Sequence, residues 1–310
     1  MPVAVLEGKS VFETEDVARA YIANCDKKFA TRVGEITERL MGDRNLKMIG
    51  LSGPSCSGKT TAAKILINRL RAGGKQVHLI SVDNFFREQL RERTVAEAAS
   101  TQTIDFDSID ALDLPLFEDF MRNLMQKGKA QMPDFNIGAS RREGWKTVEC
   151  TGESDIFLIE GIQVVYPEIR RCLNQYPYRS LFIQVERSLS VGGVLYAPED
   201  IRFLRRLVRD YYFRESPAAF TFFTWESVRA NEIRNILPYA DDCDEKMDSL
   251  MGYEVGMLRP HLEKILRELP VGSPYLDRAN EILRRIGDVQ SLRGAWLAEQ
   301  SLYHEFVGNL

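Results

Sequence analysis

The sequence predicts an α/β fold with a central, mainly parallel sheet of about five strands and helices on both faces. From residue 47 onward, short apolar runs rich in β-branched residues alternate with longer amphipathic segments, as expected when strands alternate with helices. The 310 residues are 44% hydrophobic and 28% charged, with no low-complexity segment, which is typical of a globular protein. A glycine-rich turn joins the first strand to the following helix and indicates a function.

Residues 10–45 carry apolar positions at three- and four-residue spacing, so residues 1–45 are predicted to form an N-terminal helical extension. Apolar runs predict strands at 47–52, 76–83, 155–162 and 179–186. Amphipathic segments predict helices at 60–74 and 109–128, and residues 129–135 and 145–150 are expected to pair as an antiparallel excursion.

From residue 199 onward the pattern predicts only helices. The main domain is therefore expected to span residues 46–310. Within it we expect a lid at about 196–216 and a helical C-terminal region at about 225–310, both packed around the sheet rather than folding separately. The apolar positions of the C-terminal helices fit either an intramolecular core or a subunit interface, so a homo-oligomer stays open.

The glycine-rich turn Gly53-Pro-Ser-Cys-Ser-Gly58-Lys59-Thr60 matches G-x-x-x-x-G-K-[ST] in full, after a strand and at the start of a helix. Such a loop points successive backbone N–H groups at phosphate oxygens, and the helix N-terminus adds partial positive charge. Lys59 is expected to reach the β- and γ-phosphates, and the Thr60 hydroxyl to bind Mg²⁺. The sequence thus predicts a P-loop NTPase fold that binds a nucleoside triphosphate with Mg²⁺. The expected nucleotide-binding residues are Gly53, Ser55, Cys56, Ser57, Gly58, Lys59, Thr60 and Thr61.

Two carboxylates stand where predicted strands end. Asp83 follows the second strand, where it can accept a proton from an acceptor hydroxyl or orient that hydroxyl for attack. Glu160 ends a buried strand and suits a Mg²⁺ ion or its water. Thr60, Asp83 and Glu160 are therefore the predicted metal-binding set, with Lys59 and Asp83 as catalytic residues. The alternatives are a turn or helix cap for Asp83 and a plain loop acid for Glu160.

Four arginines, Arg202, Arg205, Arg206 and Arg209, recur at i, i+3, i+4 and i+7 and would form one basic stripe on a helix. Beside a phosphate loop, such a stripe is expected to close over the phosphates and neutralise transition-state charge. Arg205 and Arg209 are assigned to catalysis and Arg206 to the nucleotide. A solvated face or a nucleic-acid surface is the alternative, but the net charge of -4 argues against nucleic acid.

The motifs occur in a recognisable order. They are GPSCSGKT (53–60), SVDNFF (81–86), IDFDSIDALD (104–113), MPDFNIGASRR (132–142), FLIEGI (157–162) and RFLRRLVRDYYFR (202–214). With them, the chain resembles the uridine kinase and phosphoribulokinase family of P-loop kinases, over roughly residues 45–310. The resemblance implies ATP-dependent phosphoryl transfer to a small hydroxyl-bearing acceptor, by default a pyrimidine nucleoside. It also implies that Asp107 binds sugar hydroxyls and that Phe135 and Arg142 belong to the acceptor site.

The acceptor segment departs from the family pattern. Uridine kinases tend to read P-x-Y-D-F-x-x-x-x-R, whereas this chain has Phe135, Asn136 and Ile137 before Arg142. The loss of a hydroxyl, a charge and an aromatic ring favours a second hypothesis, a kinase of a sugar phosphate or other small alcohol, with Arg141 and Arg142 for the acceptor phosphate. A third hypothesis is a nucleotide-binding regulator, against which the presence of Asp83 argues.

The remaining composition indicates a cytoplasmic protein without a membrane or nucleic-acid partner. Five scattered cysteines form no C-x-x-C pair and fit reduced thiols, and three histidines exclude a His-rich metal centre. The N-terminal residues are too acidic for a secretory signal, and no apolar run is long enough to cross a bilayer.

Overall fold

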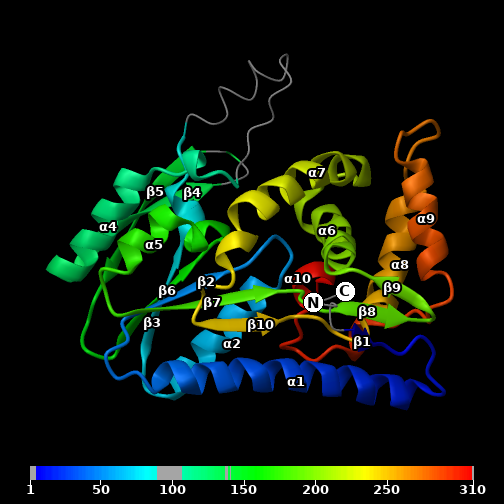
Figure 1. Cartoon of the computed structure of the whole chain (residues 1–310), viewed down its shortest axis with the longest axis horizontal. Helices are drawn as coiled ribbons and strands as arrows, with labels where there is room; N and C mark the ends of the chain where they lie inside the picture. The colour runs from blue at the N-terminus through cyan, green and yellow to red at the C-terminus, as the bar shows by residue number, and fades with distance from the viewer. Residues whose placement is uncertain (1–4, 89–106, 137–138, 140, 309–310) are drawn as a thin grey trace.

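The computed structural model describes residues 5–88, 107–136, 139 and 141–308. At its centre lies a five-stranded sheet in the order β10-β7-β2-β6-β3, and every neighbouring pair in it is parallel. The strands are β2 (Met48–Ser52), β3 (Gln76–Ser81), β6 (Asp155–Glu160), β7 (Tyr178–Gln184) and β10 (Glu245–Asp248). The predicted fold class is therefore confirmed (Figure 1).

The fifth strand, β10, lies in the region for which the sequence predicted only helices, so that prediction was wrong there. β10 is an edge strand of four residues, and Met247 is its only hydrophobic residue. It forms because its backbone pairs with β7 in register, which no local hydrophobic pattern reveals. A small sheet of β1 (Val5–Glu7), β8 (Ser188–Val191) and β9 (Val194–Tyr196) was not predicted either.

Both faces of the central sheet are covered by helices. Along β6, Leu158 packs into the cluster that includes α1 (Glu15–Met41) and α2 (Lys59–Ala72). Its neighbours Phe157 and Ile159 pack into the cluster that includes α4 (Leu114–Lys127) and α5 (Pro167–Leu173). Successive side chains of a strand point to opposite faces, so the alternation places α1 and α2 on one side and α4 and α5 on the other.

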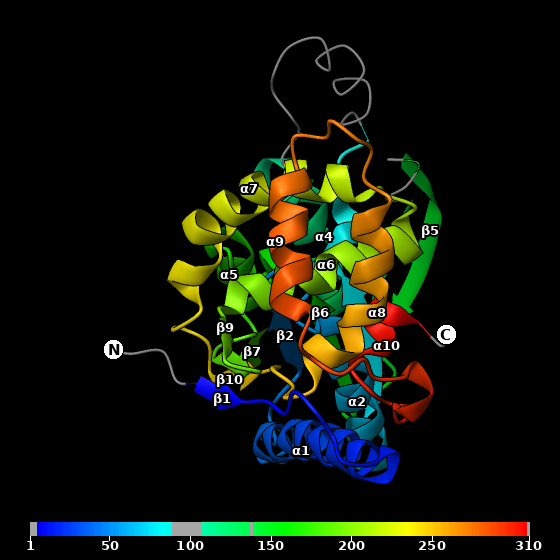
Figure 2. The ribbon, with the colours of Figure 1, turned by 90° about the vertical axis from the view of Figure 1, so that its right-hand side faces the viewer.

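The predicted N-terminal helix and antiparallel excursion both form. α1 begins after Thr14, whose side chain accepts a hydrogen bond from the Val17 N–H and so caps the first turn. It runs along the lower edge of the molecule in both views (Figures 1 and 2). β4 (Lys129–Asn136) pairs antiparallel with β5 (Arg141–Glu149), close to the residues predicted. The hairpin carries the acceptor segment out from the sheet edge.

The C-terminal half is mostly helical, as predicted, with α6 (Pro198–Arg214), α7 (Ala218–Asn235), α8 (Glu254–Arg267), α9 (Leu276–Ile286) and α10 (His304–Val307). Figure 2 shows α8 and α9 standing side by side in front of α6. The apolar residues of α8 and α9 belong to the same core cluster as those of α1, so these helices pack within the chain. No helix of the described part is long and apolar enough to span a membrane.

Two buried ion pairs fix α6 to its neighbours. Arg202 pairs with Glu232 of α7 at 2.5 Å, and Arg205 pairs with Glu254 of α8, with both partners of the second pair wholly inaccessible to solvent. A buried guanidinium without a carboxylate would carry a large desolvation penalty, so each pair requires both members. Half of the predicted basic stripe therefore lies in the protein interior.

We expect Glu254→Gln to lower the free energy of unfolding by about 3 kcal/mol, because it leaves the buried Arg205 guanidinium without a counter-charge. Denaturant unfolding followed by circular dichroism measures this change. The control is Glu263→Gln on the same helix, which breaks a partly exposed i,i+4 pair with Arg259 and should cost about 0.5 kcal/mol or less. Equal effects of the two substitutions would show that the buried pair does not fix α6.

Candidate functional site

The carboxyl ends of three adjacent strands bring the predicted catalytic residues to one edge of the sheet. β6 lies between β2 and β3, and Glu160 at its end is in register with Leu51 of β2 and Ser81 of β3. β2 runs into the phosphate loop and Lys59, and β3 runs into the short turn that contains Asp83. Ligands of open parallel sheets bind at this edge, so the geometry defines a candidate site.

The phosphate loop is built from backbone conformations and contacts that its glycines permit. Gly58 has φ 93°, a left-handed conformation at the start of α2 that a side chain would strain. At Gly53 a Cβ atom would lie 1.9 Å from the Ile183 carbonyl oxygen of β7. The Lys59 ammonium donates to the carbonyl oxygens of Gly53 at 2.9 Å and Pro54 at 3.2 Å. The lysine therefore folds over its own loop, where a phosphate would be held.

Burial raises the pKa of both site carboxyls. Desolvation raises the pKa of Asp83, and the nearby Lys59 ammonium opposes this shift. Burial also raises the pKa of Glu160, to about 7. The Lys59 ammonium opposes this shift, whereas repulsion from Asp83 and Glu305 adds to it. Among the described residues, neither carboxylate has a hydrogen bond or ion pair to satisfy it. The positive charges of Lys59 and, for Asp83, of Arg214 therefore only partly offset the burial of the two carboxyls.

These carboxylates fit a magnesium ion in their chemistry. Carboxylate and hydroxyl oxygens are the hard donors that Mg²⁺ prefers, and Thr60, at the start of α2, adds an exposed hydroxyl. Within the described ranges, no group of three or more His, Cys, Asp or Glu side chains could hold a metal by itself. A cation here would therefore complete its coordination with phosphate oxygens and water, as Mg²⁺ usually does in phosphate sites.

The other half of the basic stripe lies on the phosphate loop. Arg206 and Arg209 each donate to the Ser55 hydroxyl, at 3.2 and 3.4 Å. Asp210, which sequence reasoning missed, pairs with Arg209 at 2.6 Å and Arg206 at 3.2 Å and is itself buried. One carboxylate thus orients two guanidinium groups and leaves a net positive charge beside the loop, which favours a phosphate.

Arg202 and Arg205 reach the loop in a different way. Arg202 donates to the Ser55 carbonyl oxygen at 3.3 Å and Arg205 to the Cys56 carbonyl oxygen at 3.1 Å. The remaining donors of Arg205 are directed at Glu254 and Ser249. In this conformation, Arg205 therefore fixes the backbone of the loop to α6 and α8, whereas the sequence predicted it as a catalytic lid residue.

Part of the predicted acceptor segment lies next to the turn that contains Asp83. Asn84 accepts a hydrogen bond from the Phe135 N–H at 3.4 Å, which fixes the end of β4 to this turn. The buried Phe135 ring packs edge-on against Phe86, with ring centroids 5.9 Å apart. Ile137, in the middle of the segment, lies outside the described residues.

The other two predicted acceptor residues, Arg142 and Asp107, each contact an aromatic residue. The guanidinium of Arg142 lies 4.7 Å from the centre of the exposed Trp145 ring, and its buried Nε has no hydrogen-bond partner among the described residues. The backbone carbonyl of Asp107 accepts a hydrogen bond from the Tyr166 hydroxyl at 2.6 Å. Both residues are thus placed through contacts that the motifs did not reveal.

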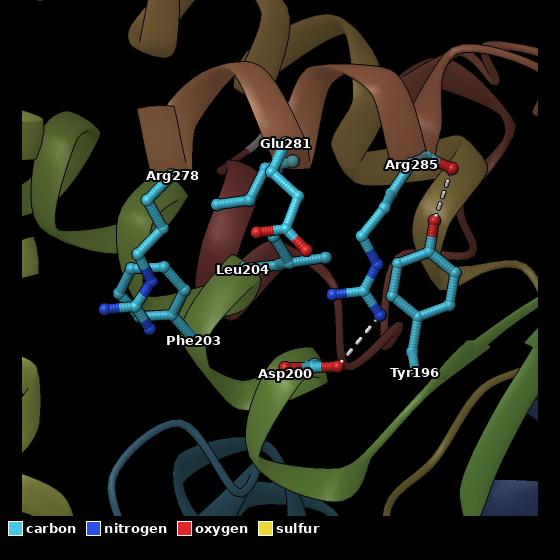
Figure 3. A pocket seen from close by; sticks show the side chains of 8 residues that line it. Tyr196, Asp200, Phe203, Leu204, Arg278, Glu281 and Arg285 are labelled. Atoms are coloured by element: carbon cyan, nitrogen blue, oxygen red, sulfur yellow. Dashed lines mark hydrogen bonds and ion pairs between the residues drawn. The ribbon is translucent and has the colours of Figure 1, made fainter. Parts of the chain in front are cut away.

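A separate cavity of about 170 Å³ lies between α6 and α9 (Figure 3). It is lined by Tyr196, Asp200, Phe203, Leu204, Arg278, Glu281, Ile282 and Arg285. Arg285 pairs with Asp200 at 2.9 Å, and Arg278 lies over the Phe203 ring at 4.7 Å. The lining contains no residue of the phosphate loop and neither Arg206 nor Arg209, so this cavity is distinct from the phosphate site.

Comparison with known proteins agrees with this geometry. The model of the phosphoribulokinase / uridine kinase family matches residues 48–247. The chain belongs to this family. As a family member it is a P-loop kinase, a phosphotransferase that acts on an alcohol group.

Family relatives differ in how much of their length they share with this kinase. The uridine kinase of Lactobacillus johnsonii is 30% identical over 163 residues, which are 53% of this chain and 67% of that protein. The uridine-cytidine kinase-like 1 of Mus musculus is 29% identical over 163 residues, but only 26% of it is covered. The phosphoribulokinase of Rhodobacter spheroides superposes with a TM-score of 0.46 at 14% identity, covering 79% of this chain and 99% of that chain.

The raised pKa of Glu160 predicts a pH-dependent stability of the metal-free kinase. Its pKa is about 7 in the folded protein and near 4.5 when unfolded, so the folded state binds more protons in this window and loses stability as the pH rises. Glu160→Gln removes this dependence. The free energy of unfolding of the variant minus that of the parent should therefore be larger at pH 8 than at pH 5, by on the order of 2 kcal/mol.

Denaturant unfolding in EDTA at the two pH values measures this difference. Glu226→Gln, at an exposed position of α7, is the matched control and should leave the pH dependence unchanged. If the free energies of unfolding of Glu160→Gln and the parent differ by the same amount at both pH values, Glu160 does not titrate near neutral pH.

Proposed function

We propose that this kinase transfers the γ-phosphoryl group of ATP, with Mg²⁺, to a hydroxyl group of a small acceptor, by default a pyrimidine nucleoside. The observation that carries the proposal is the meeting of Lys59, Asp83 and Glu160 at the ends of three adjacent strands, with Arg206 and Arg209 on the same phosphate loop. Phosphoryl transfer depends on positioning and charge neutralisation, and this arrangement offers both.

Each group has a role that follows from its place. Lys59 leaves the loop carbonyls to hold the β- and γ-phosphates, while Arg206 and Arg209 take up charge that develops during transfer. Thr60 and Glu160 would hold Mg²⁺, with Asp83 next to them. A bound Mg²⁺ supplies charge neutralisation between the phosphates and the carboxylates. Asp83 accepts the proton of the acceptor hydroxyl, for which its raised pKa makes it a better base.

The acceptor is proposed to lie between the turn that contains Asp83 and the β4–β5 hairpin. Phe135 is fixed next to this turn, and Asp107 and Arg142 are the other predicted acceptor residues. Several relatives are named uridine kinases, which supports a nucleoside as the default. The exposed Trp145 ring beside Arg142 offers an aromatic face on which a base could stack.

A sugar phosphate or another small alcohol is the second candidate acceptor. It is favoured by the buried Arg142 Nε, which lacks a hydrogen-bond partner within the described residues and would suit an acceptor phosphate. Asn136 in place of the family's aspartate removes a negative charge from the same segment. Its amide instead donates to Glu143 at 3.1 Å.

The choice of acceptor is tested by ATP-to-ADP turnover with Mg²⁺ across nucleosides, sugar phosphates and small alcohols. We expect uridine or cytidine to stimulate turnover at least tenfold over the acceptor-free rate and to yield the monophosphate. Stimulation by a sugar phosphate alone would overturn the nucleoside assignment. If no acceptor stimulates turnover although ATP binds, the protein is instead a nucleotide-binding regulator.

Asp83→Asn tests the catalytic assignment. The amide keeps the size of the side chain but cannot accept the proton, so the acceptor-dependent rate should fall by a factor of ~100 or more while ATP affinity stays within about threefold. Stopped-flow transfer and calorimetric ATP binding measure the two quantities. Asp288→Asn, at an exposed position just after α9, is the control and should change neither. An unchanged transfer rate would remove Asp83 from the mechanism.

A further inference from the structure

The C-terminal segment of residues 301–307 lies against the phosphate loop. The backbone N–H and the hydroxyl of Thr61 both donate to the Glu305 carboxylate, at 3.2 and 3.1 Å. Beside this contact, the Leu302 side chain is so close to Gly58 that a Cβ there would lie 2.5 Å from Leu302 Cδ1. A carboxylate from the far end of the chain is therefore bound at the helix start that follows the phosphate loop.

The backbone of this segment is firmly anchored, whereas the Glu305 side chain is not. Leu302, Tyr303 and Phe306 are completely buried, and the Phe306 ring lies 5.1 Å from the Arg205 guanidinium. Glu305 is partly exposed, and within the described residues only Thr61 holds its carboxylate by hydrogen bonds. The carboxylate can therefore rotate away from α2 without moving the segment.

The donors that Glu305 occupies are of the kind that phosphates use. The first backbone N–H groups of a helix have no partner inside the helix, and in phosphate loops they point at phosphate oxygens. A carboxylate oxygen resembles a phosphate oxygen in charge and in hydrogen-bonding capacity. Each N–H serves one acceptor well, so the carboxylate and a phosphate oxygen compete for Thr61.

We propose that Glu305 is an internal competitor for the nucleotide: it holds the place of a phosphate oxygen at Thr61 until a triphosphate displaces it. The proposal rests on the ATP binding proposed above. Glu305 also stands close enough to Glu160 to repel it, so it adds a third negative charge to the site of Asp83 and Glu160.

Glu305→Gln tests this competition, because it keeps the size of the side chain and removes the charge. Calorimetric binding should show that Mg·ATP and pyrophosphate each bind about tenfold more tightly to the variant, while adenosine, which has no phosphate, binds equally to both proteins. Glu299→Gln, at an exposed position of the same C-terminal region, is the matched control and should leave all three affinities unchanged. Thermal unfolding of each variant checks that it is folded.

Unchanged or weaker Mg·ATP binding by a folded Glu305→Gln variant would overturn the proposal. If that variant does not fold, Glu305→Asp keeps the charge but draws the carboxylate away from Thr61, and an unchanged Mg·ATP affinity would again overturn it. Because these are binding measurements, tighter ATP binding without any phosphorylated acceptor would contradict only the proposed kinase reaction. An unchanged affinity with uridine phosphorylated would contradict only the competition by Glu305.

Discussion

The site depends on one electrostatic constraint, the desolvation of two carboxylates beside one lysine. The carboxyl ends of β2, β6 and β3 meet at one sheet edge, so Lys59, Glu160 and Asp83 share a space with little water. The positive charges of Lys59 and, for Asp83, of Arg214 lower these pKa values, but burial outweighs them and raises the pKa of both carboxyls. This imbalance suits a cation that arrives with phosphates, which supports the proposed binding of ATP with Mg²⁺.

The helix α6, in contrast, carries an excess of positive charge from its arginines. Arg202 and Arg205 are neutralised by Glu232 and Glu254 and hold the backbone carbonyls of the phosphate loop in place. Arg206 and Arg209 share Asp210 and keep a surplus of positive charge next to the loop. One helix therefore both fixes the loop and offers charge to a phosphate. A helix anchored by two buried ion pairs is less free to move than the lid expected from the sequence.

The features that the sequence predicted well are those encoded locally. The phosphate loop, four strands of the sheet and the antiparallel hairpin each depend on residues within a short window. The features it missed depend on distant partners. β10 forms by pairing with β7, the division of the arginine stripe depends on Glu232 and Glu254, and Glu305 reaches Thr61 across most of the chain. The roles of Asp107, Phe135 and Arg142 remain predictions, since no acceptor defines them.

The most direct measurement of the central claim is the affinity of the purified protein for ATP with Mg²⁺ and in EDTA, by calorimetry at pH 8. At this pH Glu160, whose pKa is about 7, is largely ionised and repels a triphosphate that carries no cation. The account predicts that ATP binds at least tenfold more weakly in EDTA than with Mg²⁺. Equal affinities in the two conditions would contradict it, because the two carboxylates would then not need a cation to accept the nucleotide.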